Sequence, residues 1–360
     1  MDWGAIKNQT QVRLRLMKKS LLAVAIPAIL ATQAQAVELY NDGKSTLTLG
    51  GHITVMVDDK SGDAELNDGT SRINLAFDTQ LGNGFTGYGK VEQAVNLVES
   101  GDGFKSRLGY VGVKHDDYGS LTMGKQWGVF YDAEVVTDYP FAFYADHGGI
   151  YSFGADGGES GMGRADKAVV YRNGFDLGNA GALEYGLQWQ GTNGAFDDRF
   201  GGSLAYLIGD FRFATAYYGG DVNEEVYGIA KGESVDGTAF SVAYGTWGKG
   251  FYAAATYSLV DNTEAGYRFV GEGEGFESTV AYGTENGHIF HAGYRFMDSK
   301  DVIQELGRKY SEEDFIFGVA KSLTNRMQTF VEYRISMGDD TGSAIGVSDN
   351  AFAIGLRYYL

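Results

Sequence analysis

Apolar and polar residues alternate with a period of two along most of the chain. Every second residue from Phe352 to Leu360 is apolar, and the residues between them are small or polar, with Arg357 among them. Because the side chains of a β-strand point to opposite faces in turn, this segment predicts a strand with one apolar and one polar face. The same alternation recurs after Val37, and no long window there shows the apolar stripe of a helix. The pattern therefore predicts an all-β fold.

We predict sixteen strands, each of about the 9–11 residues that a tilted strand needs to cross a bilayer. They lie near residues 46–58, 71–81, 85–97, 104–115, 119–126, 164–175, 181–191, 201–208, 210–219, 236–246, 250–260, 275–285, 288–298, 313–323, 326–337 and 351–360. The connections alternate in length. Tight turns such as Leu81–Gly84 contain the Gly and Asn residues that tolerate the positive φ of hairpins, whereas the longest loop runs from about Trp127 to Gly163. Short turns at one rim and long loops at the other are typical of an outer-membrane barrel.

The two faces of the predicted strands also differ in charge. In the segment 326–335, Arg326 and Glu332 share one face, whereas Val331 and Tyr333 share the other. An apolar face and a charged face suit a barrel that contacts lipid outside and encloses water inside. A closed barrel also satisfies the backbone hydrogen bonds of every strand, which hydrocarbon cannot do. We therefore predict a 16-stranded antiparallel transmembrane β-barrel.

The first 36 residues differ from the rest of the chain. In the segment 17–36, two lysines precede an apolar run, and Ala34-Gln-Ala36 provides small residues for cleavage after Ala36, which predicts an export signal peptide. The apolar run is too short to span a bilayer as a helix, although an N-terminal membrane anchor is the alternative. We interpret residues 1–16 as an upstream extension or as part of a long basic leader. Residues 37–360 are then predicted to form one barrel domain.

Composition and charge exclude several classes of function. There is no Cys, which rules out disulfides and thiolate chemistry. Removing residues 1–36 takes away five basic residues and one acidic residue and leaves 24 basic and 46 acidic residues, a net charge of −22, which argues against nucleic acid as a partner. The acids cluster in Gly-rich gaps, at 58–68, 272–277, 298–313 and 339–349, where we expect long solvated loops.

No catalytic or cofactor motif stands out. The chain has no Gly-x-Ser-x-Gly sequence, and its histidines are not arranged with serine and acid partners as in a catalytic triad. The five histidines are scattered along the chain, so we expect no metal site: they are His52, His115, His147, His288 and His291. We therefore predict neither an enzyme nor a cofactor.

Four stretches, in order and with matching spacing, resemble the general diffusion porins of Gram-negative outer membranes. Val37–Asn41 resembles their mature N-terminus, and Arg72–Gln80 with Phe85–Gly89 resembles strands two and three. Lys105–Asp132 is similar to strands four and five, and Gly163–Asn173 to strand six. The resemblance implies a homotrimer in the outer membrane, in contact with lipid and lipopolysaccharide. It also implies passive diffusion of small hydrophilic solutes and ions through a water-filled barrel.

The resemblance further implies a third loop that folds into the lumen and narrows it, with loop acids facing a ladder of wall arginines. The matching arginines are Arg72, Arg107 and Arg164. On strand one the basic position falls on Gly51 or His52, depending on the register. Read from the residues alone, Arg107 takes the face opposite Leu108 and Tyr110, which would place it in the lumen.

The loop acids come from the segment 127–163. Asp138 matches the acid of the family best, and Asp146 is the second candidate. Like charges on the wall repel one another, by about 1 kcal/mol at about 4 Å even in bulk water, so acids are expected opposite the arginines. The resulting transverse field would favour small polar solutes. The net acidity of the chain leads us to expect a mild cation preference.

The loop departs from the family in its tip. Phe141 stands where an acidic residue is usual, and with Phe143 and Tyr144 it makes the tip aromatic. The tip suggests an alternative function, a solute-specific porin, although these aromatic residues could equally serve to anchor the loop to the wall. A second alternative is a surface receptor or adhesin that uses the acidic loops. The arginines could also be ordinary solvated lumen residues without a role in selectivity.

Overall fold

The computed structural model describes residues 36–60, 62–99, 103–143, 157–265, 268–303, 308–338 and 350–360. Its strands are β1 (Val37–Asn41), β2 (Ser45–Asp58), β3 (Glu65–Asp68), β4 (Arg72–Gly82), β5 (Phe85–Val95), β6 (Phe104–His115), β7 (Gly119–Trp127), β8 (Arg164–Asp176), β9 (Ala182–Gln190), β10 (Arg199–Ile208), β11 (Phe211–Asp221), β12 (Ser234–Thr246), β13 (Lys249–Ala265), β14 (Arg268–Gly283), β15 (His288–Ile303), β16 (Arg308–Ser322), β17 (Met327–Ser336) and β18 (Asn350–Tyr359). Two short helices, α3 (Tyr131–Glu134) and η1 (Gly178–Ala180), complete the described elements.

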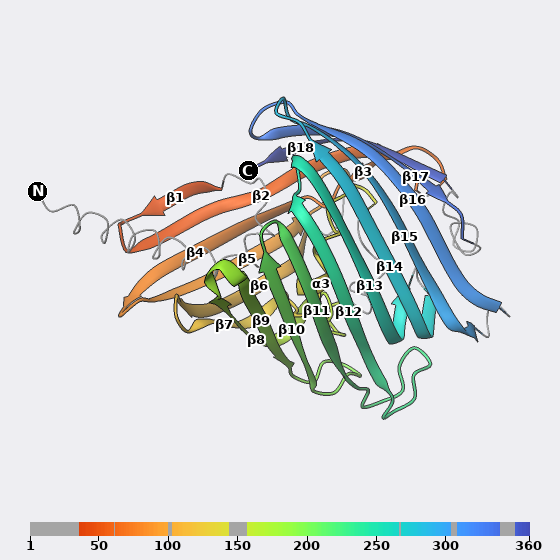
Figure 1. The fold of residues 1–360 in the computed structure, drawn as a ribbon, viewed down its shortest axis with the longest axis horizontal. Helices are drawn as coiled ribbons and strands as arrows, with labels where there is room; N and C mark the ends of the chain where they lie inside the picture. The colour runs from red at the N-terminus through yellow and green to blue at the C-terminus, as the bar shows by residue number, and fades with distance from the viewer. Residues whose placement is uncertain are drawn as a thin grey trace, which may run out of the picture.

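The strands form one closed antiparallel barrel (Figure 1). From β4 onward each strand pairs with the next one along the chain, and β18 pairs with β2, with Tyr359 opposite His52, which closes the sheet. The short β1 pairs with β2 on the edge that β18 also uses and so continues β18. Segments β3 and β4 pair with the other edge of β2 and form one interrupted strand. The eighteen segments thus make sixteen barrel strands, and the predicted number is confirmed.

The connections alternate in length as the sequence predicts. The turn between β4 and β5 consists of Asn83 and Gly84, which have φ values of 52° and 82°, the left-handed region that such a tight turn requires. The next connection, from β5 to β6, spans residues 96–103, and the connection from β7 to β8 spans residues 128–163. Short turns therefore lie at one rim of the barrel. The other rim carries the long loops, except that residues 266–267 and 304–307 are short connections where the strands extend into the predicted loops.

Two of the acidic segments predicted as solvated loops are largely strand. Glu272–Glu277 lies within β14, and the predicted loop 298–313 falls mostly within β15 and β16. In β14 the acids alternate with glycine, which is itself a period-two pattern, and the ladder to β13 continues through them. Backbone pairing therefore extends the strands beyond the predicted ends, where acidic side chains can contact water.

The apolar and polar faces of the barrel follow the predicted alternation. On β11, Phe211, Phe213 and Tyr217 are exposed, whereas Arg212 and Tyr218 are buried. We call the face with the exposed large hydrophobic side chains the apolar face and the opposite one the polar face. None of the helices in the described ranges is long and apolar enough to cross a membrane. One short helix, α3, is buried, and at four residues it is too short to leave the periodic stripe that would predict it.

Residues 1–35 lie outside the described residues, and so do Tyr144 and Asp146. The leader, its extension and cleavage after Ala36 therefore stay predictions. In the structure, Ala36 immediately precedes β1.

Candidate functional site

Five basic side chains gather on the polar face of one side of the barrel. They come from β2, β4, β6, β8 and β18 and comprise His52, Arg72, Arg107, Arg164 and Arg357. His52 stands opposite Arg72 in the ladder between β2 and β4. We call these five residues the basic cluster. It contains all four basic residues that the sequence selected, and Arg357 in addition.

Backbone geometry distinguishes Gly51 from His52. Gly51 has a φ of 115°, and a Cβ atom added there would lie 2.1 Å from the carbonyl oxygen of Arg72. Only glycine fits this position. His52 therefore supplies the side chain, and its Nδ1 lies 2.9 Å from the Oγ1 of Thr54.

Arg107 reaches the polar face through a β-bulge. Glu92 pairs with Leu108 and Gln93 pairs with Ser106, so Arg107 is the extra residue between them. The prediction that Arg107 lies opposite Leu108 is wrong, because Leu108 shares the face of its pairing partner Glu92. The bulge turns Arg107 onto that same face, where its Nε donates to Oε1 of Glu92 at 3.0 Å. Strict alternation would have placed Arg107 on the apolar face.

Glu92 is an acid within the basic cluster that sequence reasoning did not select. Besides Arg107, its carboxylate contacts Nζ of Lys90 at 3.0 Å and accepts a hydrogen bond from Nδ2 of Asn74 at 3.3 Å. The sequence carried a signal, because Lys90 and Glu92 lie two residues apart and therefore on one face of a strand. Arg357 was likewise visible as a polar residue in an alternating strand, and its Nε donates to Oγ1 of Thr54 at 2.8 Å.

The third loop (residues 128–163) begins with a buried segment that contacts the polar face of the wall. Asp132 accepts hydrogen bonds from Arg172 at 3.1 and 3.2 Å and from Ser203 at 2.7 Å. Farther along, the Tyr252 hydroxyl donates to the carbonyl oxygen of Val136 at 2.6 Å. Strands β8, β10 and β13 therefore hold this part of the loop.

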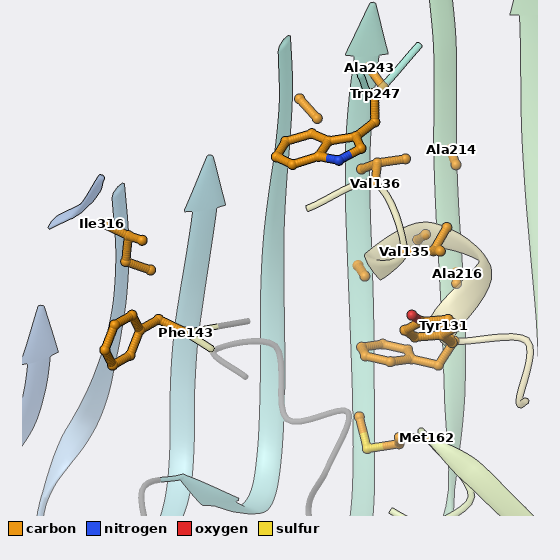
Figure 2. Packing of buried hydrophobic residues seen from close by; sticks show 14 of the residues in the cluster. Tyr131, Val135, Val136, Phe143, Met162, Ala214, Ala216, Ala243, Trp247 and Ile316 are labelled. Atoms are coloured by element: carbon orange, nitrogen blue, oxygen red, sulfur yellow. The ribbon is translucent and has the colours of Figure 1, made fainter. Parts of the chain in front are cut away.

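Small side chains make room for α3 on the wall. The helix packs against β10, β11 and β12. Figure 2 shows Tyr131 and Val135 of this segment beside Ala214 and Ala216 of β11. The buried alanines in this part of the wall are Ala205, Ala214, Ala216, Ala239 and Ala243. Larger residues at these positions would occupy the space of the loop, so this alanine strip is a second signal that the sequence analysis missed.

A buried carboxylate on β17 holds the tip of the loop. Glu332 accepts hydrogen bonds from three consecutive backbone N–H groups, those of residues 141–143, at 2.6, 2.8 and 3.2 Å. Nε2 of His291 lies 3.2 Å from the same carboxylate. Between them stands Gly318, which pairs with both residues across the sheet. A Cβ atom at Gly318 would lie 2.1 Å from Nε2 of His291, so the pair depends on glycine.

The described aromatic residues of the tip lie against the wall. Phe141 is 6% exposed and stacks on Phe330, with ring centroids 4.8 Å apart, while Cζ of Arg357 lies 4.9 Å from its ring centre. Phe143 is 3% exposed, and Cζ of Arg334 lies 5.4 Å from the centre of its ring. These contacts are those of an anchor. The third predicted tip residue, Tyr144, lies outside the described part of the chain.

The four acids in the described part of the loop, Asp132, Glu134, Asp138 and Glu159, differ in their access to solvent. Asp132 and Glu134 are buried, and Ser258 donates a hydrogen bond to Glu134. Burial, together with the nearby carboxylate of Glu277, raises the pKa of Glu134 well above its usual range. Asp138 keeps partial solvent contact, and its Oδ2 accepts a hydrogen bond from the Tyr131 hydroxyl at 2.5 Å. Among the acids in the described part of the loop, Asp138 and Glu159 are therefore the two with partial access to solvent.

The fold and the charges together define an outer-membrane β-barrel channel. The family model described as Gram-negative porin matches residues 21–358, and the chain belongs to this family. It is 30% identical over 361 residues to outer membrane porin PhoE of Enterobacter cloacae, and the match covers 95% of this chain and 99% of that relative. It is 28% identical to outer membrane porin C of Salmonella typhimurium, with 95% and 100% covered. The protein is thus an outer-membrane porin and not an enzyme.

Solved structures agree in fold. The structure of Salmonella typhi OmpF in complex with daunomycin superposes with a TM-score of 0.77 at 23% identity and covers 90% of this chain and 100% of that chain. An anion-selective porin from Comamonas acidovorans gives a TM-score of 0.66 at 16% identity, with 88% and 100% covered. At these identities the likeness concerns the fold alone.

Proposed function

We propose that this porin is a water-filled channel for passive diffusion of small hydrophilic solutes and ions, narrowed by its third loop. The loop bonds to polar-face side chains such as Arg172 on β8, Tyr252 on β13 and Glu332 on β17. The apolar face of the same strands stays exposed, as Phe251 on β13 and Tyr333 on β17 illustrate. Contacts confined to the polar face, over strands so far apart in the ring, support a loop that lies inside the barrel.

The constriction is proposed to lie between the basic cluster and the loop acid Asp138. The observation that carries this proposal is the division of charge around the wall. The loop is anchored from β8 round to β17, whereas the basic cluster occupies β18, β2, β4, β6 and the start of β8. Positive charge on one side and Asp138 on the other create a transverse field, which orders water and favours polar over apolar solutes. Asp146 remains the second candidate acid.

The proposed partners are two further copies of the chain, together with outer-membrane lipid and lipopolysaccharide. Away from the strand ends, the exposed side chains on the apolar face of β4 to β7 are mostly aliphatic: Leu75, Val91, Val111, Val113, Leu121 and Met123, with Phe77 as the aromatic one. On the other side of the barrel, Phe213, Tyr217, Phe240, Phe251, Tyr282 and Phe290 are exposed. Aromatic girdles mark surfaces that meet the lipid interface. The aliphatic side, from β4 to β7, is therefore the proposed contact between subunits of a homotrimer.

The test is conductance in planar lipid bilayers. Purified trimer should insert in steps and close in three equal decrements at high voltage, because each subunit carries its own channel. Correctly folded trimer that shows no conductance would refute the channel. The reversal potential in a salt gradient tests the expected mild cation preference, and a clear anion preference would overturn that expectation.

The structure gives no support to a solute-specific porin. That alternative rested on the aromatic tip, but Phe141 and Phe143 are packed against the wall and hold the loop. No described contact favours a receptor or adhesin either. General diffusion is therefore the proposed function.

A further inference from the structure

A stacked aromatic pair connects the base of the third loop to Asp138. Trp127 ends β7 and pairs across the ladder with Arg164, which begins β8. The rings of Trp127 and Tyr131 are stacked, with centroids 3.8 Å apart and planes at 14°. Cζ of Arg164 lies 5.0 Å from the centre of the Trp127 ring. The hydroxyl of Tyr131 then donates to Oδ2 of Asp138 at 2.5 Å.

The local chain path brings these groups together. Tyr131 is the first residue of α3, four residues after Trp127, and the connecting turn brings the two rings to one side of the chain. After the helix the backbone turns back, with the N–H of Asp138 donating to the carbonyl oxygen of Val135 at 3.4 Å. This turn returns Asp138 to the hydroxyl end of Tyr131. The tyrosine ring is buried, and Asp138 is partly exposed.

We propose that Tyr131 is a positioning residue that sets the orientation and charge of Asp138, and that its stack on Trp127 fixes the distance of this acid from Arg164. The inference rests on the proposed role of Asp138 in the constriction. A hydroxyl that donates to a carboxylate favours the ionised form and restricts its rotation. A buried stacked ring has few alternative positions, so the hydroxyl is held in place. One aromatic pair thus sets both the positive and the negative charge at the base of the constriction.

The experiment compares Tyr131→Phe with Asp138→Asn in the full-length trimer. The phenylalanine keeps the stack and removes only the hydroxyl. Tyr139→Phe is the matched control, because it removes a hydroxyl from the loop residue next to Asp138. The ring of Tyr139 stacks on Trp247 and not on Trp127. The readout is the cation-to-anion permeability ratio, measured from the reversal potential in a salt gradient between acid and neutral pH.

We expect Tyr131→Phe to raise, by about one unit, the pH at which half of the cation contribution to the permeability ratio is lost. The reason is that the ionised carboxylate of Asp138 loses a hydrogen bond. Tyr139→Phe should leave this pH unchanged. In the Asp138→Asn background, Tyr131→Phe should add no further change. Equal effects of the two tyrosine variants, or additive effects of Tyr131→Phe and Asp138→Asn, would overturn the inference.

Two outcomes separate this inference from the proposed constriction. If Asp138→Asn changes selectivity and Tyr131→Phe does not, Tyr131 is not a positioning residue and the constriction stands. If Asp138→Asn itself leaves selectivity unchanged, the assignment of Asp138 to the constriction fails, and the role of Tyr131 fails with it.

Discussion

The two sides of the barrel wall use charge differently. From β9 to β17, several charged side chains on the polar face are buried and paired, as Glu332 with the loop tip and Asp314 with Arg295 at 2.8 Å illustrate. From β18 through β2 to β6, basic residues accumulate around a single acid of the cluster, Glu92. Charges on the first side hold the third loop, and we propose that charges on the second side act on the passing solute. The same residue types therefore have different roles, depending on whether the loop covers them.

From this contrast we expect the largest effect on stability when the carboxylate of Glu332 is removed. Glu332→Ala leaves three backbone N–H groups of the loop tip without their acceptor and His291 without its carboxylate. Breaking a buried charged contact of this kind costs about 3–5 kcal/mol. The free energy of unfolding, measured by urea titration in lipid vesicles, should fall by that amount.

Glu285→Ala provides the control for Glu332→Ala, because Glu285 is an exposed acid in a short turn. It should leave the unfolding free energy unchanged. Equal stability of Glu332→Ala and wild type would show that the tip contact does not hold the loop.

A smaller loss of stability is expected from Gly318→Ala on the same side of the wall. The added Cβ would lie 2.1 Å from Nε2 of His291 and 2.9 Å from Cγ of Glu332, so the pair must move apart. Overpacking of this kind costs about 1–3 kcal/mol. Gly109→Ala is the matched control on β6, in another part of the barrel, since a Cβ there meets nothing within 4 Å. If both variants unfold at the same urea concentration, the glycine does not serve the His291–Glu332 contact.

On the open side of the wall, Arg107→Ala should change transport more than stability. The substitution removes one positive charge from the basic cluster and leaves Glu92 with Lys90 and Asn74 as partners. The reversal potential in a salt gradient should shift toward cations, while the unfolding free energy should fall less than in Glu332→Ala, because Glu92 keeps two polar partners. Lys249→Ala, at an exposed residue beside a short turn, should leave the reversal potential unchanged. A shift toward anions in Arg107→Ala would contradict the assignment of the cluster to the constriction.

The smallest effect concerns pH. Burial and Glu277 raise the pKa of Glu134 above its ordinary value of 4.5, so the docked loop binds a proton that the unfolded chain releases above that pH. Stability of the loop contact is therefore complete below about pH 4.5 and declines as the pH rises toward the raised pKa. Protease cleavage within the third loop should accelerate at alkaline pH in wild type. In Glu134→Gln, which cannot ionise, the cleavage rate should be independent of pH over the same interval; a dependence equal to that of wild type would exclude Glu134 as its source.

The sequence predicted the barrel well because a half-buried strand has a strict period of two. All sixteen strands were found, and the faces of β11 and β17 were correct. The predicted ends of β14 and β15 were wrong, because backbone pairing continues into glycine-rich and acidic segments where apolar alternation stops. The four-residue strand β3 and the four-residue helix α3 are too short to produce a periodic signal.

The site was predictable only in part. Arg72, Arg164 and His52 follow from resemblance and alternation, but the position of Arg107 depends on a bulge, which one sequence does not reveal. The role of Glu332 depends on backbone N–H groups of the loop tip, which contribute no side-chain pattern. The positions of Tyr144 and Asp146 fall outside the described residues, so their assignment to the tip and the constriction stays a prediction.

The pairing of β18 with β2 has a consequence for biogenesis. Tyr359 meets His52 across the seam, so the ring cannot be completed before the final residues of the polypeptide are available. Joining ends so far apart in the chain is entropically costly, and contacts at such sequence separation form slowly. Until then both edges of the unfinished sheet expose unpaired backbone groups, which other chains could join. The nascent polypeptide should therefore need protection from aggregation until its last strand is released.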